Sequence, residues 1–407
     1  MQNTSHSLGI IPLSLSKLLE RFAYYGMRSI LVLYMVHELA FDERHSSKIY
    51  GAFILAAGLL PLIGGLIGDL LLSTKMTAII GGFIQAIGFF VLAFPSQMGI
   101  YVGLFIIALG TGLYSPNILS TISTLYKNRT ERLDAAMLIL YITINIGAFL
   151  GSYLLALTCD YAGYKMGFVV CGLIMLGSPL IIFLSGNLLT DASKAPNLFI
   201  EEQKREVTDA SSVLIIIATI LSVSIFWIIY ELSNNPIFDR FSEIESFFQS
   251  FYSTYNSIST FSLIFVGIIL ILIYSFVKAS SLLKIAIGFV IYAISCAIIG
   301  VYCQREISSS FMIIILSAVF LQSIAELFIS PTALSIICRY GSTKFNSTLL
   351  GAHLAGGSIF SYFTSSLIVN SRHLGPSVLM LISIGTLIFF AAIFLVLYLV
   401  TRERKIY

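Results

Sequence analysis

The stretch from Lys17 to Arg28 holds the residues of this sequence with the clearest chemical potential. It reads K-L-L-E-R-F-A-Y-Y-G-M-R, and its three cations and one carboxylate interrupt a segment that is otherwise hydrophobic enough to cross a membrane. Each such charge costs roughly 2.5–3.5 kcal/mol near the centre of a lone spanning helix, so it persists only against a protein interior or a wet cavity. With about 100° between successive residues, one broad helix face is predicted to carry Lys17, Glu20, Arg21, Tyr24, Tyr25 and Arg28.

The composition predicts that many more helices surround this one. The 407 residues are 57% hydrophobic and only 11% charged, with a mean hydropathy of +0.95, whereas soluble domains are about 25% charged. We therefore expect an all-α polytopic membrane protein. Apolar stretches of about 20 residues predict about twelve spans, at 12–37, 48–71, 76–96, 99–126, 134–158, 165–189, 213–235, 251–277, 280–302, 309–337, 346–371 and 376–401.

One long polar interruption divides these spans. It predicts an N-terminal six-helix bundle at 1–190, a cytoplasmic linker at 191–212 and a C-terminal six-helix bundle at 213–407. Two six-helix halves joined in this way are the organisation of the major facilitator fold, in which the substrate site lies near the membrane midplane between the halves.

Basic residues gather in alternate loops, for example at Lys127, Arg129, Lys204, Arg205 and Arg402. This bias predicts a multi-pass protein of a bacterial inner membrane or a plasma membrane, with both termini in the cytoplasm. The net charge of +3 is then a topology signal, and we expect no nucleic-acid partner.

The sequence offers little for enzymatic or metal chemistry. Its five cysteines and five histidines form neither C-x-x-C spacings nor a metal-ligand cluster, and no nucleophile with a base or phosphate-binding glycine loop is found. We expect a protein that is not an enzyme and that holds neither a metal nor a cofactor.

Two further carboxylates fall well inside predicted spans. Glu231 lies in the seventh span and Glu326 in the tenth, whereas the buried cations lie in the first. Cations in one half and carboxylates in the other would suit a zwitterion, whose carboxylate meets arginine and whose ammonium meets glutamate. Structural pairing of these charges across the bundle is the alternative.

Asp69 is placed differently, at the cytoplasmic end of the second span in G-G-L-I-G-D, with Lys75 following. This resembles the loop signature of the facilitator superfamily, although Leu70 stands where a basic residue is usual. The predicted role of Asp69 and Lys75 is a gate contact between helix ends, and the alternative is an ordinary helix-end charge.

Several blocks of sequence resemble the proton-dependent oligopeptide transporter family. E-R-F-A-Y-Y-G-M-R, from Glu20 to Arg28, is similar to the family's first-helix signature, usually E-x-x-E-R-F-x-Y-Y-G. G-T-G-L-Y-S-P-N, Y-I-T-I-N-I-G-A-F-L-G, the F-W…E of the seventh helix and the E-L-F-I-S-P of the tenth follow in the family's order.

The resemblance implies the residues of a peptide pocket. Arg28 would take the peptide carboxylate, Glu326 the ammonium, and Asn145 would hydrogen-bond to peptide amides. For the aromatic residues Tyr24, Tyr25 and Trp227, packing is the alternative. The full implied lining is Arg21, Tyr24, Tyr25, Arg28, Asn145, Trp227, Glu231, Asn256, Glu326 and Ser330.

The departures from the family bear on proton coupling. Lys17 replaces the first glutamate of the signature, Ser115 replaces a fourth-helix lysine, and Gly58 stands where a tyrosine is expected. The remaining candidates for proton coupling are Glu20, Glu231 and Glu326, with His353 as a further relay candidate whose alternative is a packed helix histidine.

The combined expectation is a secondary active transporter that imports di- and tripeptides by alternating access. We expect it to be driven by a proton gradient through a modified network, with small peptides, protons and the lipid bilayer as its partners, and to be a monomer. One alternative is a facilitator for another zwitterionic or anionic solute, uncoupled or differently coupled. The other is a transport-inactive receptor or scaffold that keeps the fold.

Overall fold

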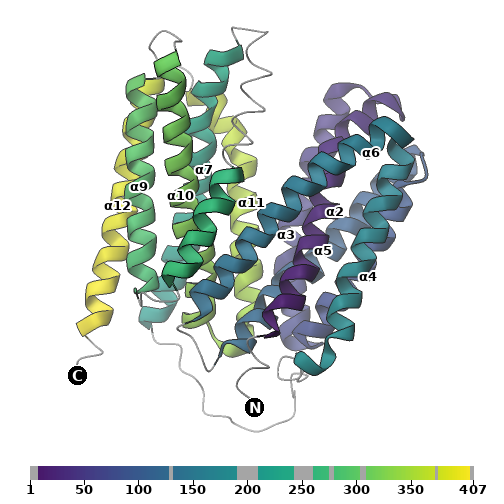
Figure 1. Cartoon of the computed structure of the whole chain (residues 1–407), viewed down its shortest axis with the longest axis horizontal. Helices are drawn as coiled ribbons and strands as arrows, with labels where there is room; N and C mark the ends of the chain where they lie inside the picture. Colours follow the sequence, from purple (N-terminus) through teal and green to yellow (C-terminus); the bar gives the residue numbers. More distant parts are fainter. Residues whose placement is uncertain are drawn as a thin grey trace. The chain divides into compact units, whose positions relative to one another are not determined.

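The structure is a computed structural model that describes residues 8–127, 132–189, 210–242, 260–274, 279–302, 309–371 and 375–403. Apart from short connections, these residues are helical, and they contain no strand (Figure 1). The all-α prediction is therefore confirmed. The elements are α2 (Ile10–His37), α3 (Glu43–Leu70), α4 (Thr74–Leu92), α5 (Gln97–Leu125), α6 (Leu133–Leu184), η2 (Gly186–Leu188), α7 (Ala210–Ser242), α9 (Ser281–Tyr302), α10 (Ser309–Tyr340), η4 (Thr343–Phe345), α11 (Asn346–Ser371) and α12 (Pro376–Glu403).

Each predicted span falls on a helix, with one pair joined. The spans at 134–158 and 165–189 lie on α6, which is interrupted at Gly163 (φ 80°, ψ 166°). Only glycine adopts such a backbone without steric cost, so this residue ends one span and begins the next. The span predicted at 251–277 is represented by the helix Thr260–Tyr274.

Eight helices among the described residues are long and apolar enough to cross a membrane. α2 is not one of these eight, although it is 28 residues long. Its charged residues lower its hydropathy, so α2 depends on its neighbours to hold those charges away from lipid.

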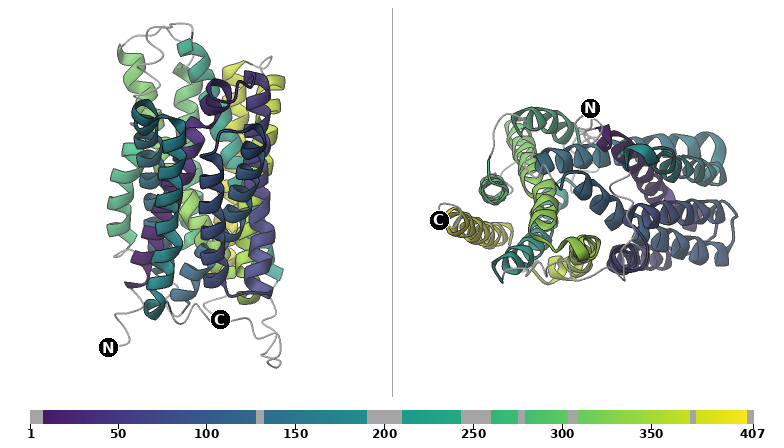
Figure 2. Two further views of the ribbon diagram at one scale, coloured as in Figure 1. Left: turned by 90° about the vertical axis from the view of Figure 1, so that its right-hand side faces the viewer. Right: turned by 90° about the horizontal axis from the view of Figure 1, so that it is seen from below.

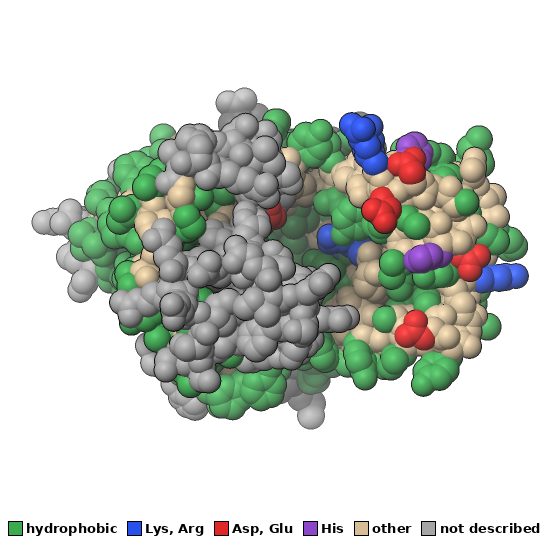
Figure 3. Space-filling model, turned by 90° about the horizontal axis from the view of Figure 1, so that it is seen from above, with side chains coloured by type: hydrophobic (Ala, Val, Ile, Leu, Met, Phe, Trp, Pro, Cys, Tyr) green, Lys and Arg blue, Asp and Glu red, His purple; other side chains and the backbone are tan. Residues whose placement is uncertain are grey.

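Short polar residues begin several helices and explain where they start. Asp42 caps α3 by accepting a hydrogen bond from the His45 amide (2.8 Å), and Ser96 caps α5 by accepting one from the Gly99 amide (2.8 Å). The connection before α3 exposes Asp42, Glu43 and Arg44. Seen from above, charged and histidine side chains gather on this side of the first helices (Figure 3).

The chain forms two compact units. The first comprises Met1–Val213 together with Ile337–Ile359, and the second comprises Leu214–Ile336 together with Phe360–Tyr407. α10 and α11 therefore each run through both units. The sequence division at 190 and 212 stays a prediction, because most of the proposed linker lies outside the described residues, while Ala210 already begins α7.

In the first unit, α2 packs against α6, and α4 packs against α5 and α6. Seen from below, these purple to teal helices lie beside one another (Figure 2). Glycines allow α2 and α6 to approach closely: a Cβ added at Gly151 would overlap the backbone of Phe22, and one added at Gly26 would overlap Leu155. Small residues at helix crossings are the usual basis of membrane-helix packing.

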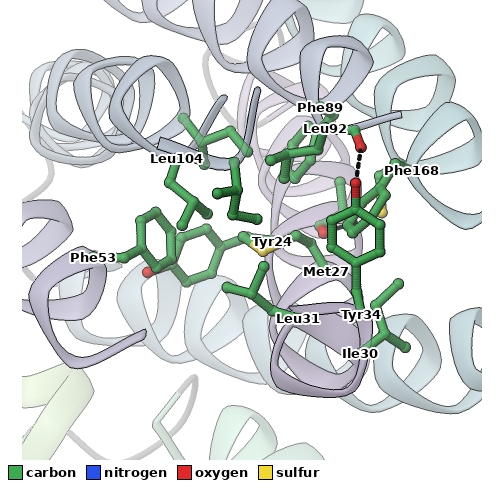
Figure 4. Packing of buried hydrophobic residues seen from close by; sticks show 14 of the residues in the cluster. Tyr24, Met27, Ile30, Leu31, Tyr34, Phe53, Phe89, Leu92, Leu104 and Phe168 are labelled. Carbon is green, nitrogen blue, oxygen red and sulfur yellow. Dashed lines mark hydrogen bonds between the residues drawn. The ribbon is translucent and has the colours of Figure 1, made fainter. Parts of the chain in front are cut away.

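A hydrophobic cluster fills the space between these helices (Figure 4). Met27 and Leu31 of α2 meet Phe89 of α4 and Phe168 of α6, all fully buried. The hydroxyl of Tyr34 donates a hydrogen bond to the carbonyl oxygen of Leu92 (3.2 Å), so its polar end is satisfied inside the cluster. The apolar face of α2 thereby holds the helix in one rotational setting.

The second unit has a smaller aromatic core. α9 packs against α12, and Phe289 of α9 lies 6.0 Å, centroid to centroid, from both Phe390 and Phe394 of α12. These contacts position α9, which also contacts α7 through Tyr292 and α10 through Ser295.

The close crossing of α2 and α6 predicts a strong effect of a small substitution. Gly151→Ala should lower the free energy of unfolding by about 1–3 kcal/mol, because the new methyl group meets backbone that cannot rotate away. Gly51→Ala is the matched control, since nothing lies within 4 Å of a Cβ at Gly51. Thermal unfolding of both variants in detergent checks this, and equal melting temperatures would contradict the packing argument.

Candidate functional site

The charged residues at the start of the signature form one buried cluster. Arg21 binds the Glu20 carboxylate with two nitrogens, Nε at 2.6 Å and Nη2 at 2.5 Å. Lys17 Nζ lies 3.0 Å from Oε2 of the same carboxylate, the oxygen that also accepts from Arg21 Nε. The Glu20 side chain is 0% exposed and that of Lys17 is 4% exposed. The predicted interior location of these charges is therefore observed, and they pair within α2 itself.

Neighbouring helices supply neutral polar groups to this cluster. Ser115 of α5 lies within hydrogen-bond distance of Lys17 Nζ (3.2 Å) and Arg21 Nη2 (3.4 Å). Gln85 of α4 donates to Glu20 Oε1 at 3.4 Å. The ring of Tyr114 lies 5.0 Å from Lys17 Nζ, in cation–π geometry.

The hydroxyl of Tyr114 is held by two serines. It lies 2.7 Å from Ser16 Oγ and 3.0 Å from Ser178 Oγ. This hydroxyl group and Gln85 were absent from the predicted site. The sequence does show polar residues inside these apolar spans. Sequence periodicity alone, however, does not reveal that residues of different spans meet at one place.

The two arginines of the signature lie over tyrosine rings. Arg21 Cζ is 4.8 Å from the Tyr24 ring centroid and 5.6 Å from that of Tyr25, and Arg28 Cζ is 5.7 and 5.2 Å from the same rings. Arg28 also donates hydrogen bonds to the hydroxyl of Tyr50 through Nε (3.1 Å) and Nη2 (2.8 Å). The structure thus brings the predicted arginines and tyrosines together and adds Tyr50, which sequence reasoning missed.

Tyr24 has two kinds of neighbour. It is 6% exposed and belongs to the hydrophobic cluster, with its ring 5.9 Å from that of Phe53. The packing alternative is therefore realised for Tyr24 alongside its contact with the arginines. Tyr25 is more exposed and lies 5.6 Å from Tyr24 in an edge-to-face arrangement.

Asn145 is half-buried on α6 and finds a partner in its own helix. Its Nδ2 donates to the carbonyl oxygen of Tyr141, one turn earlier, at 2.9 Å. This bond leaves its second N–H and its oxygen capable of meeting a ligand.

The second unit contains the remaining predicted residues. Trp227 of α7 packs against Phe226 and Tyr230, each with centroids 5.4 Å apart, so packing explains its position. Glu231 is exposed on α7, and Glu326 is 5% exposed on α10.

Polar groups accompany Glu326 along the same unit. Ser233 Oγ lies 2.7 Å from the Tyr292 hydroxyl, and Gln322 Nε2 lies 3.5 Å from that Oγ. Ser330, one turn after Glu326, is 6% exposed, and its Oγ has no hydrogen-bond partner among the described residues. A buried hydroxyl of this kind is able to accept or donate a hydrogen bond to a ligand.

Two predicted residues remain to be placed. His353 lies half-buried on α11, and its Nδ1 has no hydrogen-bond partner in the described part of the chain. Asn256 lies outside the described residues, so its predicted role is unaffected.

Asp69 caps α11 from the end of α3. Its carboxylate accepts hydrogen bonds from the amides of Ser347 (3.1 Å) and Thr348 (2.7 Å), and from the Thr348 hydroxyl (2.8 Å). A carboxylate at a helix N-terminus satisfies amides that have no helical partner and interacts favourably with the helix dipole. The expected contact between helix ends is present for Asp69. Lys75 forms no ion pair within the described ranges and lies beside Gly186 of η2.

Further contacts hold the 337–359 segment in the first unit. Arg339 at the end of α10 pairs with Asp134 at the start of α6 (3.2 Å), and Asn346 Nδ2 donates to Ser120 Oγ of α5 (3.0 Å). Gly58 of α3, the expected tyrosine position, faces Ser358 so closely that a Cβ would overlap its side chain. A tyrosine would not fit there while α3 and α11 pack as they do.

A comparison with known protein families identifies the superfamily of this chain. Residues 13–283 match the family described as Major Facilitator Superfamily. The chain belongs to this superfamily. The major facilitator fold predicted from the sequence is therefore confirmed, as are an integral membrane location and a transporter family that is not enzymatic.

Curated relatives narrow the resemblance. The chain is 36% identical over 164 residues to "Dipeptide and tripeptide permease B" of Aliivibrio fischeri (strain MJ11), a match that covers 40% of this chain and 33% of the relative. It is 33% identical over 183 residues to the permease of the same name from Salmonella typhimurium (strain LT2), covering 44% and 37%. The match thus spans about a third of the length of these relatives.

Solved structures agree over a longer range. A "POT family transporter in complex with 5-aminolevulinic acid" has a TM-score of 0.68 at 20% identity and 95% coverage of both chains. A "bacterial homologue of the human drug peptide transporters PepT1 and PepT2" has a TM-score of 0.65 at 21% identity, covering 98% of this chain and 99% of that one. At these identities the likeness shows the fold, and the predicted resemblance to the oligopeptide transporter family is confirmed.

The Asp69 cap predicts a graded response to substitution. Asp69→Ala should lower the free energy of unfolding by about 0.5–2 kcal/mol, because it removes the cap of α11, whereas Asp69→Asn should cost less because asparagine also caps well. Asp160→Asn, at an exposed carboxylate of α6, is the control. Thermal unfolding in detergent checks the order, and equal effects of the alanine and asparagine variants would contradict capping.

Proposed function

We propose that this protein is a secondary active transporter that imports di- and tripeptides by alternating access, coupled to protons. The observation that carries the proposal is the environment of Arg28. Its guanidinium contacts the Tyr50 hydroxyl and tyrosine rings, and no carboxylate pairs with it among the described residues. A guanidinium held this way keeps its charge for a ligand carboxylate.

The other end of a peptide requires a different group. Glu326 is a buried carboxylate on α10, with the unpartnered hydroxyl of Ser330 one turn away. Glu326 complements the ammonium of a peptide, as Arg28 complements its carboxylate. Asn145 supplies an amide group that matches peptide N–H and C=O groups in hydrogen-bonding capacity.

Alternating access requires that one site opens in turn to each side of the membrane. We propose that Asp69 takes part in such a cycle, because its three hydrogen bonds to α11 are concentrated at one helix end. For uphill import, the proton and the peptide must prefer the two facings differently. We propose Glu231 and Glu326 as the carboxylates that exchange the proton, with no cofactor beyond the proton gradient.

The membrane and the orientation that we propose rest on the charges of the loops and on the bacterial relatives named above. We propose a monomer in a bacterial inner membrane, with both termini in the cytoplasm.

A wider substrate class is the second candidate. One similar structure contains 5-aminolevulinic acid, which carries one amine and one carboxylate. Arg28 and Glu326 each complement one of these two charges. Competition of labelled dipeptide uptake by tripeptides, free amino acids and 5-aminolevulinic acid in proteoliposomes separates the two. A receptor or scaffold would bind these compounds without transporting any of them.

Arg28 provides the direct test of carboxylate recognition. Arg28→Gln should raise the KM for dipeptide uptake about 10- to 100-fold, because a hydrogen bond to a charged group contributes about 1.5–3 kcal/mol. Arg28→Lys should recover part of this loss through its charge, without the planar geometry. The exposed Arg44→Gln is the control. An unchanged KM in Arg28→Gln would remove Arg28 from the site.

Glu231 provides the test of coupling. Glu231→Gln should keep peptide exchange between equal concentrations, which requires no net proton movement, and lose accumulation driven by an inward proton gradient. The exposed Glu43→Gln is the control and should change neither. Intact proton-driven accumulation in Glu231→Gln would exclude this residue from coupling.

A further inference from the structure

The cluster around Glu20 is unusual in its balance of charge. Two cations, Lys17 and Arg21, contact one carboxylate, and both Lys17 and Glu20 are almost completely buried. Sequence resemblance implies glutamate at position 17 and lysine at position 115, whereas this chain has the cation at 17 and a serine at 115. Lys17 Nζ lies 3.2 Å from Ser115 Oγ, so a cation from α2 lies beside the position of the implied lysine. The carboxylate implied at position 17 is absent.

The hydrogen bonds of Glu20 leave little room for a proton. Oε1 accepts from Arg21 Nη2 (2.5 Å) and Gln85 Nε2 (3.4 Å), while Oε2 accepts from Arg21 Nε (2.6 Å) and contacts Lys17 Nζ (3.0 Å). A carboxylate offers about four lone-pair positions, and all of them face donors here. A proton placed on either oxygen would point its O–H at an N–H group.

The surroundings offer no replacement for the charge of Glu20. From α5 the facing titratable group is Tyr114, whose hydroxyl is held by Ser16 and Ser178, and α4 contributes the neutral Gln85. From α6 the nearby group is Ser178, and Tyr50 of α3 faces Arg28. Protonation of Glu20 would leave two buried cations without a described carboxylate partner, which is strongly unfavourable.

We propose that Lys17 is a positioning residue that keeps Glu20 ionised throughout transport. The first unit then presents fixed positive charge to the anionic end of the substrate and takes up no proton. The coupling proton is carried by the carboxylates of the second unit. The transport assays of this inference depend on the proposed peptide transport. Its spectroscopic assay depends only on the protonation of the Glu20 carboxylate.

Charge-balanced variants test the inference by peptide exchange in proteoliposomes. Glu20→Gln leaves two cations and should reduce exchange at least tenfold. The double variant K17Q/E20Q restores the native net charge and should return exchange to within about threefold of the native rate. The exposed Lys165→Gln is the control for loss of a lysine. If Glu20→Gln keeps exchange and loses only proton-driven accumulation, Glu20 is a proton carrier and the inference is overturned.

Infrared difference spectra of the purified protein between pH 8 and pH 5.5 measure the protonation of Glu20 directly. They require neither peptide nor the single Glu20→Gln variant. The carboxyl C=O band of a protonated Glu20 should be absent from the native protein. It should appear in Lys17→Gln, where Glu20 has lost one of its two cations, and be absent again in K17Q/E20Q. A band in the native protein that K17Q/E20Q lacks would overturn the inference. If native protein exchanges no peptide while the spectra behave as expected, the proposed function fails and the inference stands.

Discussion

The cost of placing charge in a membrane is the constraint on which this structure depends. α2 carries Lys17, Glu20, Arg21 and Arg28, and an isolated helix with this sequence would be expensive to insert. The bundle removes that cost in two ways. Glu20 pairs with two cations inside the first unit, and tyrosine rings together with a tyrosine hydroxyl surround the arginines. Tyr50 of α3, Gln85 of α4 and Ser115 of α5 thus serve as polar partners of these charges as well as parts of the bundle.

The same helix must be packed tightly for those contacts to persist. Gly151 and Gly26 bring the backbones of α2 and α6 together, and the cluster around Met27 and Phe168 fixes the rotation of α2. Because the opposite face of α2 is locked in this way, its charged face has a defined direction. Ligand recognition by fixed charges requires such rigidity, since a side chain that must first be ordered binds more weakly.

Three polar contacts hold the 337–359 segment against the first helices. Asp69 caps α11, Arg339 pairs with Asp134, and Asn346 binds Ser120. All three contacts are polar and short in range, so they can be exchanged for water at moderate cost. α10 and α11 continue from this segment into the second unit.

The sequence by itself determined the helical class, the places of the spans and the residues that had to be shielded from lipid. It could do so because hydropathy and helical period depend on residue type and spacing alone. It also found Arg28, Glu326 and Asp69, because a charge inside or at the end of an apolar span is costly wherever its partner lies. The tertiary structure alone decided the partners on other helices: Glu20 meets Gln85, Arg28 meets Tyr50, and Gly58 is closed off by Ser358. Partner choice depends on which helices lie side by side and at what rotation, which local pattern does not encode.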